Sequence, residues 1–478
     1  MNMNIIKVAL ITVILSWMAL SAHCACCADA AAIQSDTVVT TVTAGSKMTL
    51  NDCILYGLEN SQKVNKSRYA ADNYKQDKTA AISDLFPSIS ASSSITASYG
   101  RSVDPGTNTY TTMGNLGNSY GAYANMTLFS GLQLINNVRL ASVMKLMGLD
   151  QLQQTKDELA ISIIQAYFDV IYYNSTIKIG TEQLEASLKT LEQAKVMEEM
   201  GSKSPADVAQ IETQVATERL FLVQQENKYK TSLLTLKQSI NWPIEEELNL
   251  DLDDTKYVES SYLDEKGNSL LSPAIISSIV EYAIDNNPKI EASEKNLKAS
   301  KLSLQIARGK YLPTISGQGG YNSSYYKTIS GGTDSKADPF WTQLDHNKGH
   351  YFGASISIPI FSGLARRTNV HKAKNSYKTA MEDFSIATQE LKTEITRTAF
   401  EVDGYIQEYN LAKAKADAAQ LAYDATAQKF AMGSINPIDL QTSANQLLSA
   451  KAEELNAKLQ LTVKSKLLDY YSGEPLVK

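Results

Sequence analysis

The sequence has few cysteines and prolines, no excess of positive charge, and no long apolar run beyond its start. Three of its four cysteines, Cys24, Cys26 and Cys27, lie close together, which leaves Cys53 alone, so we expect no disulfide framework. After the first 30 residues no apolar run approaches the roughly 20 residues of a membrane-spanning helix. The net charge of −6 gives no support for binding nucleic acid, which needs a clustered basic surface. With only 11 prolines, the 478 residues can form long helices.

No pattern typical of a catalytic or cofactor site is present either. Apart from the three cysteines near the start, we find no nucleophile–base set, phosphate-binding loop or cysteine cluster. His346 and His350 beside Asp345 could suggest a metal, but they lie in a segment rich in Gly and Asn that has no helical spacing to fix their geometry. We therefore expect no enzyme, no cofactor and no metal site.

The first 30 residues are built like a secretory signal peptide. The apolar run Val8–Leu20 follows a lysine and precedes the small residues of Ala28–Ala31. A lipid-anchored cysteine is the alternative, but a lipoprotein signal places a small residue just before the Cys and an aliphatic one three before it. Here His23 precedes Cys24 and also lies three residues before Cys26. We expect cleavage near Ala28–Ala31 and an exported chain without a transmembrane helix.

Motifs recur at a constant spacing in the two halves of the chain. Those repeated after 232 residues are Phe129-Ser130-Gly131-Leu132 with Phe361-Ser362-Gly363-Leu364, Phe168 with Phe400, Gly201-Ser202 with Gly433-Ser434, and Asp207 with Asp439. Upstream the spacing is 226, as in Pro87–Ser90 and Pro313–Ser316, so six extra residues lie between Pro313 and Phe361. Such a duplication predicts two copies of one unit. We assign the first repeat to residues 31–240, an acidic mixed linker to 241–271, the second repeat to 272–471 and a tail to 472–478.

Each repeat contains two segments that alternate apolar and small polar residues, which indicates strands. They are Ser88–Gly100, Ser119–Phe129, Thr314–Asn322 and Tyr351–Phe361. The polar residues 101–118 and 325–348 between them are predicted to be loops, which gives the β-hairpins 88–129 and 314–361. Apolar and polar residues also alternate along the strands of a soluble sandwich. However, four strands inserted between long helices resemble the strands of a transmembrane barrel. Four strands cannot close a barrel, so we expect a trimer that shares a 12-stranded barrel.

Long helical patterns fill the rest of each repeat. Residues 132–200 and 364–432 carry apolar positions in steps of three and four, the spacing of helices packed as coiled coils. At 1.5 Å per residue, each would span about 100 Å. Shorter helices are predicted over 50–85, 205–240, 272–311 and 437–471. Two short helices end to end would match one long helix. A freestanding coiled-coil rod is the alternative, but it gives no reason for the hairpins.

Two turns join a long helix to a short one. In the first turn, Gly201 suits the left-handed residue past a helix end, Ser204 an N-cap and Pro205 the first helical position, with Asp207 near the helix dipole. The second turn repeats this design with Gly433, Asn436 as the cap, Pro437 and Asp439.

These motifs, in this order over nearly the whole chain, resemble a TolC-type outer membrane efflux protein. The residues that carry the resemblance are the duplicated halves, the Phe-Ser-Gly-Leu junctions and the two Gly-x5-Asp turns. The resemblance implies a homotrimer with a barrel in outer-membrane lipid and a helical tunnel in the periplasm of a Gram-negative bacterium. It also implies docking of the helical tips with a periplasmic adaptor and an inner-membrane transporter.

The resemblance also assigns roles to single residues. It places the tip turns in adaptor-docking grooves and Asp439, with Asp207 as its counterpart, at the periplasmic entrance as a candidate gate. Family members that have an acidic entrance carry a second acid one turn later, where this chain has Thr442, with Gln210 in the other copy. The alternative for both acids is plain stabilisation of the helix dipole.

We therefore read the chain as a passive exit duct of a tripartite efflux or type I secretion system. An anchored coiled-coil structural protein or adhesin and a soluble periplasmic enzyme are the alternatives. The sequence does not name the cargo. Five aromatic residues are assigned to the girdle at the membrane interface: Tyr325, Tyr326, Trp341, Tyr351 and Phe352.

Overall fold

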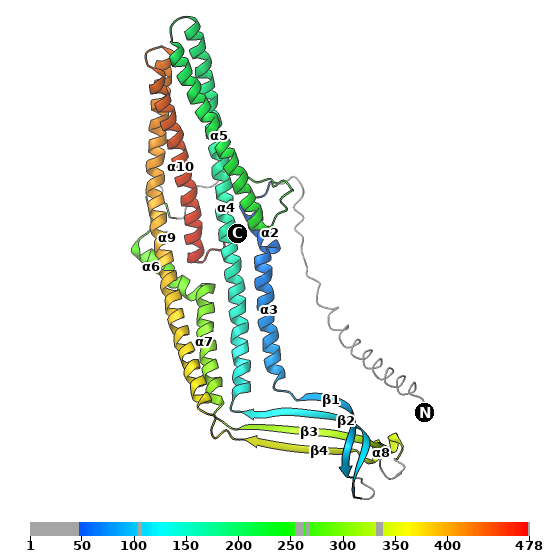
Figure 1. Ribbon diagram of the computed structural model, residues 1–478. Helices are drawn as coiled ribbons and strands as arrows, with labels where there is room; N and C mark the ends of the chain where they lie inside the picture. The colour runs from blue at the N-terminus through cyan, green and yellow to red at the C-terminus, as the bar shows by residue number, and fades with distance from the viewer. Residues whose placement is uncertain (1–46, 104–107, 254–261, 264–267, 331–337, 477–478) are drawn as a thin grey trace. The chain divides into compact units, whose positions relative to one another are not determined.

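The computed structural model describes residues 47–103, 108–253, 262–263, 268–330 and 338–476 (Figure 1). The predicted signal peptide lies outside these residues. Along the described chain the elements are α2 Leu50–Asn60, α3 Gln62–Ser83, β1 Ser88–Val103, β2 Tyr110–Ser130, α4 Gln133–Glu199, α5 Pro205–Ile240, α6 Pro273–Asn286, α7 Pro288–Gly309, β3 Thr314–Ser330, α8 Phe340–His346, β4 Gly349–Ser357, α9 Ala365–Ala431 and α10 Pro437–Ser472. The described part of the chain is thus mainly helical, with four strands.

The long helices α4 and α9 are the axis of each half. Each has 67 residues and ends within one residue of the range predicted from its heptads. Along α4 lie α5 toward one end and α3 toward the other, while α9 is flanked in the same way by α10 and α7 (Figure 1). Helix α7 also packs against α4, which joins the two halves.

The prediction of one continuous helix over 50–85, and of another over 272–311, is wrong. Both are broken at equivalent positions, at Ser61 (φ −66°, ψ 125°) and at Asn287 (φ −78°, ψ 127°). Pro288 explains the second break, because a proline disfavours helical backbone in the residue before it. Ser61 has the same conformation without a following proline.

The four strands form one antiparallel sheet in the order β1-β2-β3-β4. The register places many apolar positions opposite one another in each pair of strands, for example Ala91 with Ala122, Ala122 with Tyr321, and Ile315 with Ile356. The other face is polar, with serine pairs such as Ser94 and Ser119, whose hydroxyl oxygens are 2.7 Å apart. The alternation read from the sequence therefore gives the correct faces.

The expected loops are too long, because much of 101–118 and 325–348 is structured. Strand β2 begins at Tyr110, and its residues as far as Asn118 pair with β1. Strand β3 continues to Ser330, and α8 follows it. Strand β4 is shifted instead: it begins at Gly349 and ends at Ser357, four residues before the predicted end.

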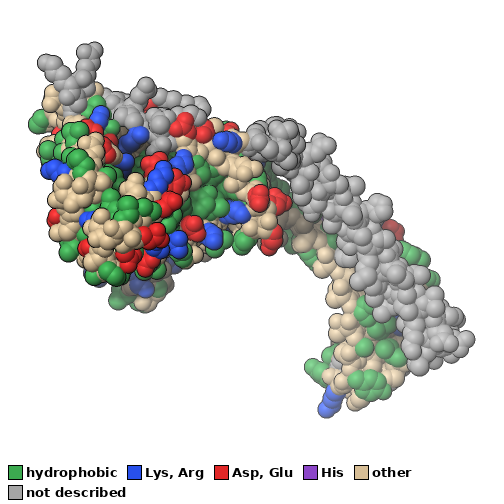
Figure 2. All heavy atoms as spheres, turned by 90° about the horizontal axis from the view of Figure 1, so that it is seen from above, with side chains coloured by type: hydrophobic (Ala, Val, Ile, Leu, Met, Phe, Trp, Pro, Cys, Tyr) green, Lys and Arg blue, Asp and Glu red, His purple; other side chains and the backbone are tan. Residues whose placement is uncertain are grey.

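The apolar face of the sheet is uncovered in the single chain. Ile89 is 77% exposed, and Phe352 is 88% exposed. Figure 2 shows acidic and basic side chains gathered over the helices, whereas the visible part of the sheet is mainly hydrophobic or uncharged. Among the helices of the described residues, none is long and apolar enough to cross a membrane.

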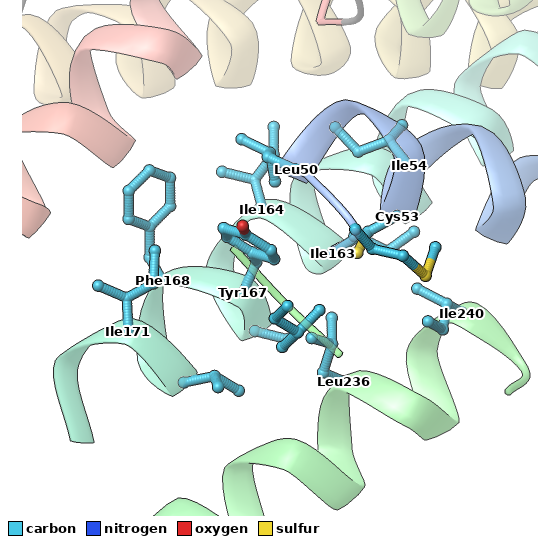
Figure 3. Close-up of a cluster of buried hydrophobic side chains, with 14 of the residues drawn as sticks. Leu50, Cys53, Ile54, Ile163, Ile164, Tyr167, Phe168, Ile171, Leu236 and Ile240 are labelled. Carbon is cyan, nitrogen blue, oxygen red and sulfur yellow. The ribbon is translucent and has the colours of Figure 1, made fainter. Parts of the chain in front are cut away.

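The largest hydrophobic cluster lies where α2, α4 and α5 meet. Figure 3 shows Ile54 of α2, Ile163 and Tyr167 of α4, and Leu236 of α5 pointing toward one another. Cys53 lies fully buried here, and burial, followed by the nearby charge of Asp52, raises the pKa of its thiol to about 12. This agrees with a cysteine that takes part in no disulfide.

The acidic linker packs against this cluster. Its glutamates at 245–247 are exposed, but Leu248 and Leu250 are buried within the cluster, and Leu250 forms a parallel bridge with Met48. The Tyr167 hydroxyl donates a 2.6 Å hydrogen bond to the carbonyl of Asp251. Residues 241–253 of the linker thus have a solvated charged side and an apolar side that covers the core.

Candidate functional site

The first tip turn connects α4 to α5 through a left-handed glycine and a capping box. Gly201 has φ 71°, and its amide donates to the Glu198 carbonyl at 2.8 Å. The Asp207 amide donates to the Ser204 hydroxyl at 3.2 Å, and the Ser204 amide donates to the Asp207 carboxylate at 3.0 Å. Hydrogen bonds from the Ser204 backbone and then its hydroxyl lower the pKa of Asp207. The predicted cap is confirmed, and Asp207 is one of its members.

The second tip turn connects α9 to α10 with a related but different cap. Gly433 has φ 73°, and Ser434 donates its amide to the Lys429 carbonyl at 2.9 Å. The Asp439 amide donates to the side-chain oxygen of Asn436 at 2.9 Å. The Asp439 side chain is exposed, so it can meet solvent or a cation.

Lys203 joins the two turns, and sequence reasoning missed it. Its ammonium donates to the carbonyl of Ile435 at 3.2 Å and lies 4.7 Å from the centre of the Phe430 ring. A cation over an aromatic face is attracted by the ring quadrupole. The sequence offers a single sign of this contact. The repeat places Lys203 at the position equivalent to Ile435, so the first copy has a basic residue where the second has an apolar one.

Below the turns, apolar residues of all four helices form a small core. Its buried members are Ala194, Val208, Ile211, Phe430 and Leu440. A narrow pocket lies beside it, lined in part by Gln210, Pro437 and Gln441. The side chain of Thr442 donates a hydrogen bond to the carbonyl of Ile438 in its own helix, and as a threonine it adds no charge beside Asp439.

The strand-to-helix junctions share a rare backbone conformation. Gly131 and Leu132 have φ 63° and 64°, and Gly363 and Leu364 have φ 57° and 66°. The first junction is tightly packed: a Cβ on Gly309, at the end of α7, would lie 2.5 Å from the carbonyl oxygen of Gly131. Around Gly363 there is no atom of the described chain within 4 Å of such a Cβ.

The possible metal and aromatic residues lie around α8. Asp345 pairs with Lys348 at 2.7 Å, and the described residues contain no group of three metal-ligating side chains. Trp341 is 78% exposed, whereas Tyr325 packs on Phe340 with ring centres 5.1 Å apart.

The chain is similar to outer-membrane efflux proteins in sequence and in fold. A model of the outer membrane efflux protein family matches residues 57–241 and 279–474. The outer membrane efflux protein BepC of Brucella suis is 22% identical over 91% of this chain and 87% of its own length. Among solved structures, CusC aligns with a TM-score of 0.73 at 15% identity, covering 89% of this chain and 92% of CusC. VceC of Vibrio cholerae aligns with a TM-score of 0.73 at 14% identity, covering 89% and 96%.

Proposed function

The chain belongs to the outer membrane efflux protein family, and from this premise we propose that three copies form one exit duct of a tripartite efflux or secretion system. As a member, it is an efflux channel of a Gram-negative outer membrane and not an enzyme. The finer assignments concern the assembly, its partners and its entrance.

The trimer is inferred from the β-sheet. Strands β1 and β4 are its two outer strands, and its apolar face is exposed, as in Ile95 and Ile356. A membrane-embedded sheet must have no open edge, because lipid cannot satisfy backbone amides and carbonyls. Three copies give twelve strands, enough to close a barrel and leave a pore.

The helices supply the rest of the duct. At 1.5 Å per residue, α4 and α9 are each about 100 Å long, which reaches far from the membrane into the periplasm. Side by side in three copies, they would enclose a water-filled tunnel. No energy source is apparent in the chain, so an inner-membrane transporter has to drive export.

The tip turns are the proposed docking surface for a periplasmic adaptor. Gly201, Ser204, Pro205, Gly433 and Asn436 are all exposed, while Pro437 is buried beneath them. The caps and the Lys203 bond to Ile435 hold both turns in fixed conformations, so docking would need little ordering of the chain.

Single-channel conductance in planar bilayers tests the duct. We expect the purified protein to give steady ionic currents, since a twelve-stranded barrel leaves an aqueous path. An anchored coiled-coil adhesin with a plugged barrel would pass no ions, and the absence of current would favour it.

Asp439 is the proposed entrance gate because its carboxylate is exposed at the tip. The carboxylate of Asp207 instead accepts a hydrogen bond from the amide of Ser204 in the cap of its own helix. Asp439→Ala is expected to weaken blockade of the current by multivalent cations added at the periplasmic side. Asp207→Asn is the matched control, and it should leave blockade unchanged. An unaltered response in Asp439→Ala would remove this residue from the gate.

A further inference from the structure

A buried carboxyl group lies in the wall just below the tip turns. Glu218 of α5 is only 3% exposed, although it belongs to a helix whose other glutamates, such as Glu226, face solvent. Burying a carboxylate is costly unless the charge is paired and hydrogen-bonded. Among the described residues no lysine or arginine lies within ion-pair distance of Glu218.

Polar side chains connect Glu218 to helices of both halves. Its Oε1 atom accepts hydrogen bonds from the Ser187 hydroxyl of α4 at 2.9 Å and from Nε2 of Gln214 at 2.7 Å. Gln214 also donates to Asn445 of α10 at 3.0 Å, and its oxygen accepts from Gln441 at 2.7 Å. The network thus joins the α4–α5 pair to α10.

The two oxygens of Glu218 differ in their surroundings. Oε1 accepts two hydrogen bonds, whereas Oε2 has no hydrogen-bond partner of normal geometry among the described residues, although the Gln183 amide lies near enough to the carboxyl to lower its pKa. An unpartnered buried oxygen costs more when it carries charge. A proton on Oε2 would remove the charge and leave both bonds to Oε1 intact.

The side chains that face Glu218, directly or through Gln214, do not compensate its charge. They are Gln183 and Ser187 of α4, Gln214 of α5, Tyr423 of α9, and Gln441 and Asn445 of α10. Tyr423 is the titratable member. Burial and then the charge of Glu218, with a further contribution from Asp424, raise its pKa, so it stays neutral. Burial also raises the pKa of Glu218, against the opposing effect of the hydrogen bonds from Ser187, Gln214 and Gln183.

We propose that Glu218 is a proton-binding switch that sets how firmly the two helix pairs hold together at the tip. With Oε2 protonated, the polar network is neutral and the helices pack closely. Ionisation places an uncompensated charge among them and favours separation, which lets water reach the carboxylate. Because the folded form binds this proton more tightly than an opened form, cohesion is greatest at low pH. It is lost as pH rises through the folded-state pKa.

Hydrogen exchange at the tip tests the proposal in the full-length assembly in detergent. Exchange of residues 187–222 and 423–445 is compared between wild type and Glu218→Gln in the same buffer, so intrinsic exchange rates cancel. Gln keeps the acceptor oxygen and cannot ionise. We expect equal rates below the ordinary glutamate pKa and faster exchange in wild type as pH rises above it, up to about tenfold per pH unit until the folded-state pKa is passed. Glu226→Gln, an exposed glutamate on the same helix, should match wild type at every pH.

An infrared difference titration between wild type and Glu218→Gln gives a second readout, since burial raises the pKa of Asp157 and Asp169 as well. Wild type should keep a protonated-carboxyl band, at pH values where exposed carboxyls have ionised, that is missing in Glu218→Gln. Absence of that band in wild type, or an exchange ratio that does not change with pH, overturns the proposal.

The consequence for transport rests on the proposed function: a tip that loosens with rising pH would admit cargo more readily. Conductance tests the duct separately. A protein that conducts but has no pH-dependent tip exchange refutes the switch alone. A protein that shows the exchange effect but no current refutes the duct alone.

Discussion

At the scale of residues, the two tip turns are alike in backbone and different in how their polar groups are satisfied. Ser204 and Asp207 bond each other reciprocally, whereas Asn436 caps its helix alone and leaves the Asp439 carboxylate exposed. The caps could be predicted because a cap depends on neighbouring residues. The Lys203 bond to Ile435 could not, since its acceptor is a backbone carbonyl on a distant segment.

Gly201 offers a test of the left-handed turn. No atom of the described residues lies within 4 Å of a Cβ built on it, so Gly201→Ala should be costly through backbone conformation alone, by about 1–2 kcal/mol. Gly201→Asn should cost less, because Asn tolerates the left-handed region. Urea unfolding followed by circular dichroism checks the order, and equal losses for both variants would count against this explanation.

At the scale of elements, the length of a hydrophobic pattern determines how well the helix or strand can be predicted from the sequence. The heptads of α4 and α9 are long, and both ends were placed within one residue. Residues 110–118 contain Gly and Asn and read as a loop, but all of them pair with β1, and residues 114–118 also pair with β3. Strand pairing of this kind is tertiary and overrides local preference. The break at Ser61 also has no local signal.

Helix α8 provides a prediction about strand β3. Strand β4 pairs with β3 only as far as Asn322, and beyond it Gln343 of α8 bonds both the amide of Tyr326 at 3.0 Å and its carbonyl at 3.1 Å. The amide side chain thus stands in for a neighbouring strand. Gln343→Ala should remove hydrogen-exchange protection at Tyr326, a loss of about 0.5–1.5 kcal/mol, while Thr342→Ala should not. Retained protection at Tyr326 in Gln343→Ala would show that α8 is held there by other contacts.

At the scale of the whole molecule, the two halves are equivalent in sequence but not in burial. Phe168 is 3% exposed, in a cluster that includes Leu455 of α10, whereas its repeat partner Phe400 is 66% exposed. The position equivalent to Leu455 in the first repeat is Val223 of α5, and Val223 is 52% exposed. Within one chain, Phe168 packs in a cluster with α10. If three chains close a ring, we expect Phe400 of each chain to pack in the same way against Val223 of the next chain.

Two substitutions on α9 test this contact between chains. Phe400→Ala should destabilise the assembly by about 3–5 kcal/mol per chain, the usual effect of truncating a buried Phe. Leu421→Ala should change it by less than about 0.5 kcal/mol. Leu421 is 73% exposed, and its repeat partner, Lys189, is exposed as well. The dissociation temperature on native electrophoresis measures both, and equal effects would contradict the repeat-based arrangement.

The account depends on three chains sharing one wall, since a single chain has four strands and two outer edges. Native mass spectrometry of the protein in mild detergent tests this most directly. We expect a mass three times that of the chain. A monomer, or any stable assembly of another size, would contradict the account.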